Sequence, residues 1–263
     1  MRRAVKDWQV VFVGAGNLAT NLAKAFHRHG LKLLQVYSRT EESARTLALQ
    51  VDADWTTELT GLKEGADLYV VALTDAALTE LLPEMTRGRR QALWVHTAGS
   101  VPMDIWQGHA ERYGVFYPMQ TFSKRREVDF RTVPLFVEAA VREDAEALLE
   151  LAALLSDKVS EATSLQRKSL HLAAVFACNF SNHMYALADE VLQRHGLSFD
   201  AMLPLIDETA RKVHELPPRQ AQTGPAVRYD KNVMKHHLEM LADEPQWQEI
   251  YRLMSRSIHR LTP

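Results

Sequence analysis

A glycine-rich turn between a strand and a helix constrains this chain more than any other feature. Residues 10–13 are four consecutive apolar residues suited to a buried strand, and the next segment reads Gly-x-Gly-x-x-Ala from Gly14 to Ala19. An amphipathic run then continues to Phe26. This order predicts a strand, a tight turn and a helix, the unit with which dinucleotide-binding α/β sheets begin.

The small residues of the turn each have a physical reason to be small. Gly14 can adopt backbone angles closed to other residues, Gly16 has no side chain to hold a pyrophosphate away, and Ala19 lets the helix lie close to the strand. The helix N-terminus offers free N–H groups and a partial positive charge to a phosphate. A plain tight turn between packed elements is the alternative. We predict a dinucleotide site formed by Gly14, Ala15, Gly16, Asn17 and Leu18.

The end of the second predicted strand bears on which dinucleotide binds. Residues 33–37 predict a strand that is followed by Ser38, Arg39 and Thr40. About 20 residues after the glycines, NAD sites present an acid to the ribose hydroxyls, whereas a nearby Arg suits a 2′-phosphate. The first acid after this strand is Glu41, and the Arg39 guanidinium can hold a phosphate through two hydrogen bonds. The sequence therefore favours NADP over NAD, against the alternative of a solvated arginine.

Two later strands are expected to bring polar residues to the same edge of the sheet. Residues 67–73, which are apolar after Asp67, predict a buried strand that ends at Thr74 and Asp75, and these two residues either contact the cofactor or cap the next helix. Residues 92–95 predict another strand, followed by His96 and Thr97. Carboxyl ends of parallel strands face the ligand crevice. With further strands at 115–117 and 133–137, the alternation predicts an α/β fold with a doubly wound, mainly parallel sheet.

From about residue 160 the pattern becomes helical only, so we expect a Rossmann NADP-binding domain over residues 1–159 and a smaller helical domain over residues 160–263. Residues 163–195 contain no Pro or Gly and predict one long helix, with further helices at 203–216, 232–241 and 245–259. The loop 222–230 carries Arg228 and Asp230, which either clamp a substrate carboxylate or belong to a simple turn.

Four polar residues recur along the predicted long helix: Lys168, His171, Asn179 and Asn182. At about 100° per residue they fall within an arc of about 80° on one face. Burying such groups unpaired costs about 1–3 kcal/mol each, so either a substrate in a cleft or the backbone of the first domain is expected to pair them.

These residues suggest roles in hydride transfer, which requires a matching proton. Lys168 is the natural proton donor for a carbonyl or imine, and His171 could share that task. The two asparagines would orient the substrate, and His96 competes as the acid from the sheet edge. An ordinary core histidine is the alternative for His171.

Composition excludes several classes of protein. A net charge of -2 and a pI near 6.6 provide no basic field for nucleic acid or an anionic membrane. No apolar run approaches the ~20 residues of a membrane span. The single cysteine, Cys178, excludes an internal disulfide and argues against a cysteine-based metal site. We expect a cytoplasmic protein with a small-molecule substrate and no metal.

The glycine turn, the Ser38-Arg39-Thr40 segment and residues 96–100, 117–122, 170–180 and 222–226 together resemble a known group. It consists of bacterial two-domain proteins that join a Rossmann-like NADP-binding domain to a helical C-terminal domain of unknown function. These proteins are similar to pyrroline-5-carboxylate reductases, deazaflavin-dependent NADP reductases and 6-phosphogluconate dehydrogenase-like enzymes. The resemblance implies NADP at Gly14, Gly16 and Arg39, a site between the domains, and a homodimer formed through the helical domain.

Two differences from these related enzymes leave the reaction unidentified. Related hydroxyacid dehydrogenases have Asn four residues after the catalytic Lys, where this chain has Leu172, and the proline-synthesising reductases have Ser-Pro-Gly where it has Thr223-Gly224-Pro225. The leading hypothesis is an NADP-dependent oxidoreductase that moves hydride to or from a small carbonyl, imine or hydroxy compound. The alternatives are a non-catalytic NADP-binding sensor or scaffold, and a methyltransferase, which expects an acid where Arg39 stands.

Overall fold

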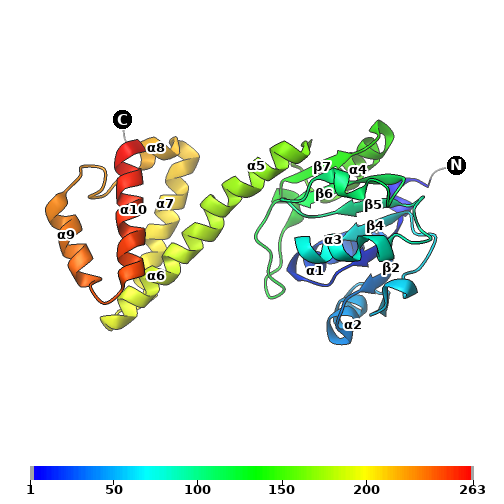
Figure 1. Cartoon of the computed structure of the whole chain (residues 1–263), viewed down its shortest axis with the longest axis horizontal. Coiled ribbons are helices and arrows are strands. Elements are labelled where there is room, and N and C mark those ends of the chain that lie inside the picture. The colour runs from blue at the N-terminus through cyan, green and yellow to red at the C-terminus, as the bar shows by residue number, and fades with distance from the viewer. Residues whose placement is uncertain (1–2, 262–263) are drawn as a thin grey trace. The chain divides into compact units, whose positions relative to one another are not determined.

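The computed structural model describes residues 3–261, and its internal contacts divide the chain into two compact units, Met1–Ser181 and Asn182–Pro263 (Figure 1). The first unit contains the sheet and the second is helical. The division falls after Ser181 rather than after residue 159, so the helix that follows the last strand belongs, by its contacts, to the sheet unit.

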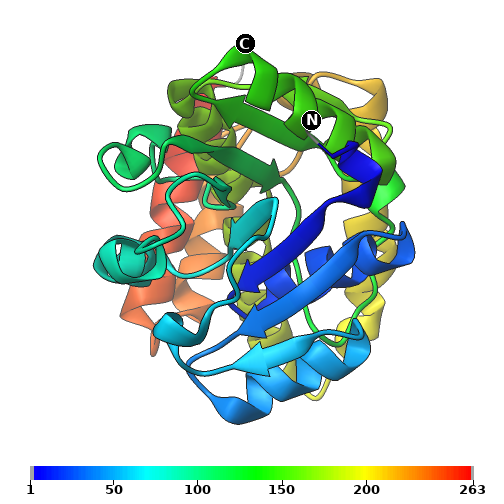
Figure 2. The same cartoon turned by 90° about the vertical axis from the view of Figure 1, so that its right-hand side faces the viewer.

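The first unit is built on an eight-stranded sheet with the order β3-β2-β1-β4-β5-β6-β7-β8 (Figure 2). Neighbouring strands are parallel except for β6 and β7, which are antiparallel. The predicted doubly wound, mainly parallel Rossmann sheet is therefore confirmed. The strands are β1 (Gln9–Val13), β2 (Lys32–Tyr37), β3 (Asp54–Thr56), β4 (Leu68–Val71), β5 (Leu93–His96), β6 (Arg112–Pro118), β7 (Leu135–Ala139) and β8 (Val159–Glu161).

Helices cover both faces of this sheet because successive strand residues point to opposite sides. In β1, Val10 and Phe12 join the core beneath α1 (Asn17–Arg28), α2 (Glu41–Gln50) and α4 (Arg142–Leu155). Val11 and Val13 instead join the core beneath α3 (Asp75–Met85) and the short 3₁₀ helix Met103–Trp106. Further 3₁₀ turns are Val5–Asp7, Leu59–Gly61, Phe130–Thr132 and Phe199–Met202.

The backbone is helical from Ser164 to Arg194, but it is not one regular α-helix. It consists of α5 (Ser164–Ala174), a π-helical segment (Val175–Phe180) and α6 (Ser181–Arg194). Because a π turn contains more residues than an α turn, directions counted at 100° per residue do not hold across it. The angles from which the single arc of Lys168, His171, Asn179 and Asn182 was predicted therefore apply only within α5, to Lys168 and His171.

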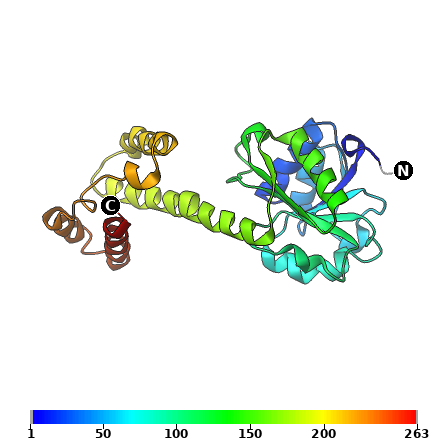
Figure 3. The same ribbon diagram turned by 90° about the horizontal axis from the view of Figure 1, so that it is seen from above.

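Up to residue 261, the second unit contains the rest of α6, four further α-helices and the 3₁₀ turn Phe199–Met202 (Figure 3). Pro218 starts a new short helix after α7 (Leu203–Glu215) ends, as expected where a proline removes a backbone donor. No helix between residues 3 and 261 combines the length and apolarity needed to span a membrane. The helices are α7 (Leu203–Glu215), α8 (Pro218–Ala221), α9 (Lys231–Met240) and α10 (Pro245–Leu261).

Candidate functional site

The two glycines of the turn have different environments. Gly14 adopts a φ of +123°, and a Cβ at this position would lie 2.3 Å from the carbonyl oxygen of Ala72. Its N–H donates to the carbonyl of Tyr37 on β2 at 2.9 Å. A Cβ on Gly16 would instead meet no atom within 4 Å. Gly14 is thus required by the fold, whereas Gly16 keeps open space in front of the turn.

The N-terminus of α1 faces that open space. Thr20 donates the first intrahelical hydrogen bond, to Gly16, so the amides of Asn17, Leu18 and Ala19 have no acceptor within the helix. The first turn contains no acidic residue that would occupy these amides. This end of the helix can therefore bind an anion such as a pyrophosphate.

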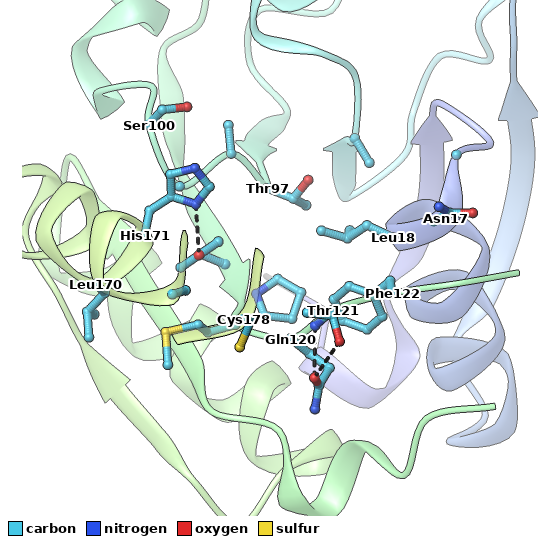
Figure 4. Close-up of a pocket in the computed structure, with 18 of the residues that line it drawn as sticks. Asn17, Leu18, Thr97, Ser100, Gln120, Thr121, Phe122, Leu170, His171 and Cys178 are labelled. Atoms are coloured by element: carbon cyan, nitrogen blue, oxygen red, sulfur yellow. Dashed lines mark hydrogen bonds between the residues drawn. The ribbon is translucent and has the colours of Figure 1, made fainter. Parts of the chain in front are cut away.

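A cavity of about 850 Å³ extends from this helix end across the carboxyl ends of β4, β5 and β6 to α5 (Figure 4). All of its lining residues belong to the first unit. Eight residues predicted from the sequence line it: Gly16, Asn17, Leu18, Thr74, Asp75, Thr97, His171 and Asn179. The cavity thus brings the predicted phosphate site and one end of the predicted polar stripe together.

The other predicted residues lie outside the cavity lining. Gly14 and Ala15 are buried behind the turn, and Ser38, Arg39 and Thr40 follow β2. Lys168 is exposed on α5 but does not line the cavity, and Asn182 belongs to the second unit.

His96 is fully buried beneath the sheet edge. Its Nδ1 accepts a hydrogen bond from the N–H of Ala98 at 3.2 Å, and its ring stacks on Trp106 with centroids 6.1 Å apart. Nε2 makes no hydrogen bond of ordinary geometry with residues 3–261, although the nearby backbone of Pro102 slightly favours the protonated ring. Burial, and secondarily the positive charge of Arg167, lowers the pKa of His96 to about 3. The ring is therefore neutral at physiological pH and is separated from the cavity.

His171 is the predicted histidine that reaches the cavity. Its Nδ1 lies 3.5 Å from the hydroxyl of Tyr117, a contact marked by the dashed line at the His171 ring in Figure 4. Tyr117 also lines the cavity, and burial raises the pKa of its phenol, an effect partly offset by Arg167. Tyr117 was not predicted as a site residue, although residues 115–117 were expected to form a strand.

A buried arginine, Arg167, connects α5 to the sheet edge. It was not predicted from the sequence either. Arg167 is 1% exposed, forms an ion pair with Glu138 on β7 at 2.5 Å, and donates to the carbonyls of Ala98 and Val101. Glu138 also accepts from the N–H and hydroxyl of Ser164, at the start of α5. These bonds fix the first turn of α5 against the loop that follows β5. No short sequence pattern predicts such a contact.

Arg39 occupies the position expected of a residue that distinguishes NADP from NAD. Val13 of β1 pairs with Tyr37 of β2, so the residues after β2 lie beside the glycine turn. Arg39 is exposed, and no carboxylate of the described part of the chain forms an ion pair with it. Its guanidinium is thus available to a phosphate.

Comparisons with known proteins agree with this geometry. Residues 9–98 match the family described as "NADP oxidoreductase coenzyme F420-dependent", and residues 133–258 match a domain of unknown function. No curated protein sequence matches the chain.

Solved structures extend the comparison to the whole chain. An imine reductase from Myxococcus stipitatus in complex with NADP⁺ is 19% identical, with a TM-score of 0.69 over 96% of this chain and 93% of that one. A pyrroline-5-carboxylate reductase from Coxiella burnetii is 14% identical, with a TM-score of 0.56 over 97% and 99%. At these identities the likeness shows a shared fold.

Another solved structure has a much higher sequence identity to this chain, and it establishes the family. A Bacteroides fragilis protein described as a putative NADP oxidoreductase is 61% identical, with a TM-score of 0.95 over 97% of this chain and 99% of its own. Identity at this level over the full length of both chains is a family relationship. The chain belongs to this family of NADP oxidoreductases, in which a Rossmann-like sheet is followed by a helical C-terminal region.

Proposed function

We propose that this protein is an NADP-dependent oxidoreductase that transfers hydride to or from a small carbonyl, imine or hydroxy compound. One observation carries the proposal: a single cavity connects the anion-binding end of α1 to the ring of His171. Dinucleotide-binding sheets hold their ligand at this edge. The cavity continues beyond Thr97 to α5, which leaves room for a substrate beside the dinucleotide.

The residues of the site fit a bound NADP. The amides at the start of α1 suit the pyrophosphate, and the unpaired Arg39 suits the 2′-phosphate. Thr74, Asp75 and Thr97 provide polar groups along the same edge. When bound, the reduced nicotinamide supplies the hydride. The preference for NADP over NAD rests on Arg39.

Of the three proton donors predicted from the sequence, Lys168, His171 and His96, only His171 lines the cavity. We propose it as the source of the substrate's proton, with Asn179 orienting the substrate. Lys168, exposed and outside the lining, is the competing donor. We further propose, from the resemblance alone, a cytoplasmic homodimer formed through the helical domain, which light scattering after gel filtration tests directly.

The experiment measures binding and turnover separately. Purified protein is titrated with NADPH by fluorescence and then mixed with NADPH and a panel of aldehydes, ketones and cyclic imines while the nicotinamide absorbance is followed. We expect tight binding and oxidation of NADPH by part of the panel. His171→Ala is expected to abolish turnover but not binding, whereas Ser169→Ala, an exposed neighbour outside the cavity, changes neither.

Other results would lead to a different assignment. Binding of NADPH without turnover of any substrate would favour a sensor or scaffold. Binding of S-adenosylmethionine without binding of NADPH would favour a methyltransferase. Loss of turnover in Lys168→Ala, with His171→Ala active, would transfer the donor role to Lys168.

A further inference from the structure

We infer that Tyr117 and His171 act as a proton-donating pair in which the Tyr117 phenol protonates the substrate and His171 restores its proton. This inference rests on the proposed function and adds a catalytic residue to it.

The pair is formed by two elements far apart in the sequence. Tyr117 lies near the end of β6 and His171 on α5, and both line the cavity, with Tyr117 Oη 3.5 Å from His171 Nδ1. Catalytic hydrogen bonds are often long before a ligand binds and tighten in the complex. Tyr117 is only 7% exposed, so the accessible part of its side chain faces the cavity rather than bulk water.

Gly99 sets the orientation of the His171 ring. A Cβ on Gly99 would lie 2.8 Å from both Cγ and Nδ1 of His171, so the ring packs directly on the glycine backbone. This contact holds the Nδ1 side of the ring toward the sheet edge, where Tyr117 lies. The residue as a whole is exposed, so the ring can exchange protons with solvent.

Arg167 fixes the position of the pair through buried hydrogen bonds to the loop that follows β5. It precedes His171 by one helical turn, is almost completely buried, and bonds to the carbonyls of Ala98 and Val101 on either side of Gly99. The same guanidinium pairs with Glu138. Helix α5 and the loop after β5 are therefore held together at the point where His171 meets Gly99.

The charges around Tyr117 suit a donor. Burial raises the pKa of the phenol, and the nearby Arg167 cation opposes this shift without reversing it, so the phenol keeps its proton through neutral pH. The one carboxylate that lines the cavity, Asp75, accepts a hydrogen bond from Ser100. Glu138 is neutralised by its ion pair with Arg167. No unpaired carboxylate among the cavity-lining residues competes as the acid.

The proposed step balances as follows. The carbon of a carbonyl or imine gains a hydride, with its electron pair, from the reduced nicotinamide dinucleotide. The Tyr117 O–H bond breaks, and its proton forms a new bond to the substrate oxygen or nitrogen. A proton then passes from Nδ1 of His171 to the phenolate while Nε2 takes one proton from solvent, and exchange of the ring protons with water returns His171 to its starting tautomer. The net change consumes one hydride and one solvent proton.

Kinetics of conservative variants test the donor role. Tyr117→Phe removes only the hydroxyl, so we expect kcat to fall by about 10²–10⁴-fold while the affinity for NADPH is unchanged. The matched control is Tyr113→Phe on the same strand, since Tyr113 does not line the cavity. An unchanged kcat in Tyr117→Phe would overturn the inference.

A second measurement does not depend on turnover. The ring signals of His171 are followed by NMR through a pH titration of the cofactor-free protein and are assigned by their loss in His171→Asn. If the two groups are paired, Tyr117→Phe shifts the midpoint of the His171 titration and Tyr113→Phe does not. An identical midpoint in all proteins would overturn the pairing.

The same binding and turnover measurements distinguish failure of the proposed function from failure of the Tyr117 role. Wild-type protein that binds NADPH but oxidises none with any substrate would overturn that function and the donor role with it. Turnover by the wild type, with loss in His171→Asn but not in Tyr117→Phe, would retain the function and overturn only the role of Tyr117.

Discussion

Gly99 and His171 are packed so closely that the first has no room for a side chain. A Cβ on Gly99 would lie 2.8 Å from Cγ and Nδ1 of the ring and 2.9 Å from its Cβ, distances that real Cβ atoms do not show. Gly99 does not have a positive φ, so backbone strain does not require glycine there. The requirement comes from the ring of His171.

Gly99→Ala is therefore expected to displace His171 while leaving the dinucleotide site intact. We expect kcat to fall at least about tenfold, because small displacements of a catalytic group are costly. Affinity for NADPH should remain at the wild-type value. Steady-state kinetics and fluorescence titration test this, and a Gly99→Ala enzyme with full activity would show that His171 can move without consequence.

Substitution by alanine should affect stability at Gly14 and cofactor binding at Gly16. Gly14→Ala places a Cβ 2.3 Å from the carbonyl of Ala72 at a φ of +123°, so the free energy of unfolding should fall by at least about 1–3 kcal/mol. Gly16→Ala meets open space and should change it by less than about 0.5 kcal/mol, yet weaken NADPH binding. Urea unfolding and NADPH titration of both variants test this contrast. Equal stability losses would contradict it.

The fold could be predicted where strands are buried on both faces. Apolar runs such as residues 10–13 and 68–73 specify such strands without help from distant residues. Strand β1 begins one residue before the first run, and β4 lies within the second. The edge strands β3 and β8 were missed because each has three residues, largely polar and accessible, and is defined by its pairing with β2 or β7. The π segment within residues 175–180 likewise has no local signal.

The candidate site was predictable only in part, for the same physical reason. The ends of β1, β4 and β5 could be placed at one edge because parallel strands share a direction. Tyr117 and Arg167 act through contacts between β6, β7 and α5, which depend on the packing of the whole unit. The helical arc was a partial guide: His171 and Asn179 both line the cavity although the π segment lies between them, whereas Lys168 on α5 does not line it and Asn182 belongs to the second unit.

Arg39→Ala tests the choice of cofactor. If the guanidinium binds the 2′-phosphate, its loss should weaken NADPH binding at least about tenfold and leave NADH binding nearly unchanged, because only NADPH carries that group. Fluorescence titration with both dinucleotides gives the ratio. Arg45→Ala on α2, also exposed, serves as the control for loss of a positive charge nearby in the sequence. Equal losses for NADPH and NADH would remove the argument for NADP.

His96 should make the stability of the sheet unit depend on pH. Its pKa is lowered from 6.5 to about 3 in the folded protein, so between these values the unfolded chain binds a proton that the folded chain does not. The free energy of unfolding should therefore decrease as the pH falls below 6.5, by up to about 1.4 kcal/mol per pH unit from this group. Urea unfolding followed by tryptophan fluorescence at pH 4–7 measures the slope. His96→Gln should flatten it, whereas His27→Gln, at an exposed site, should not.

The charge of the cavity predicts the charge of the substrate. Of the residues that line it, Asp75 alone is an Asp or Glu, and none is Lys or Arg. A substrate carboxylate would lose hydration without gaining a cation, which is unfavourable in a partly enclosed site. For matched pairs, such as a 2-keto acid and its methyl ester, kcat/KM should be at least about tenfold higher for the ester.

A designed cation should reverse this preference. Ala173 is exposed and lines the cavity from α5, so Ala173→Arg can place a guanidinium there without disturbing the core. We expect this variant to gain activity on the keto acid relative to the ester, whereas Ala173→Gln, of similar polarity but uncharged, should not. A wild-type preference for the acid would instead indicate a cation outside these lining residues. Arg228, in the predicted loop 222–230, is the residue to replace in that case, and recovery of ester preference in Arg228→Ala would identify it.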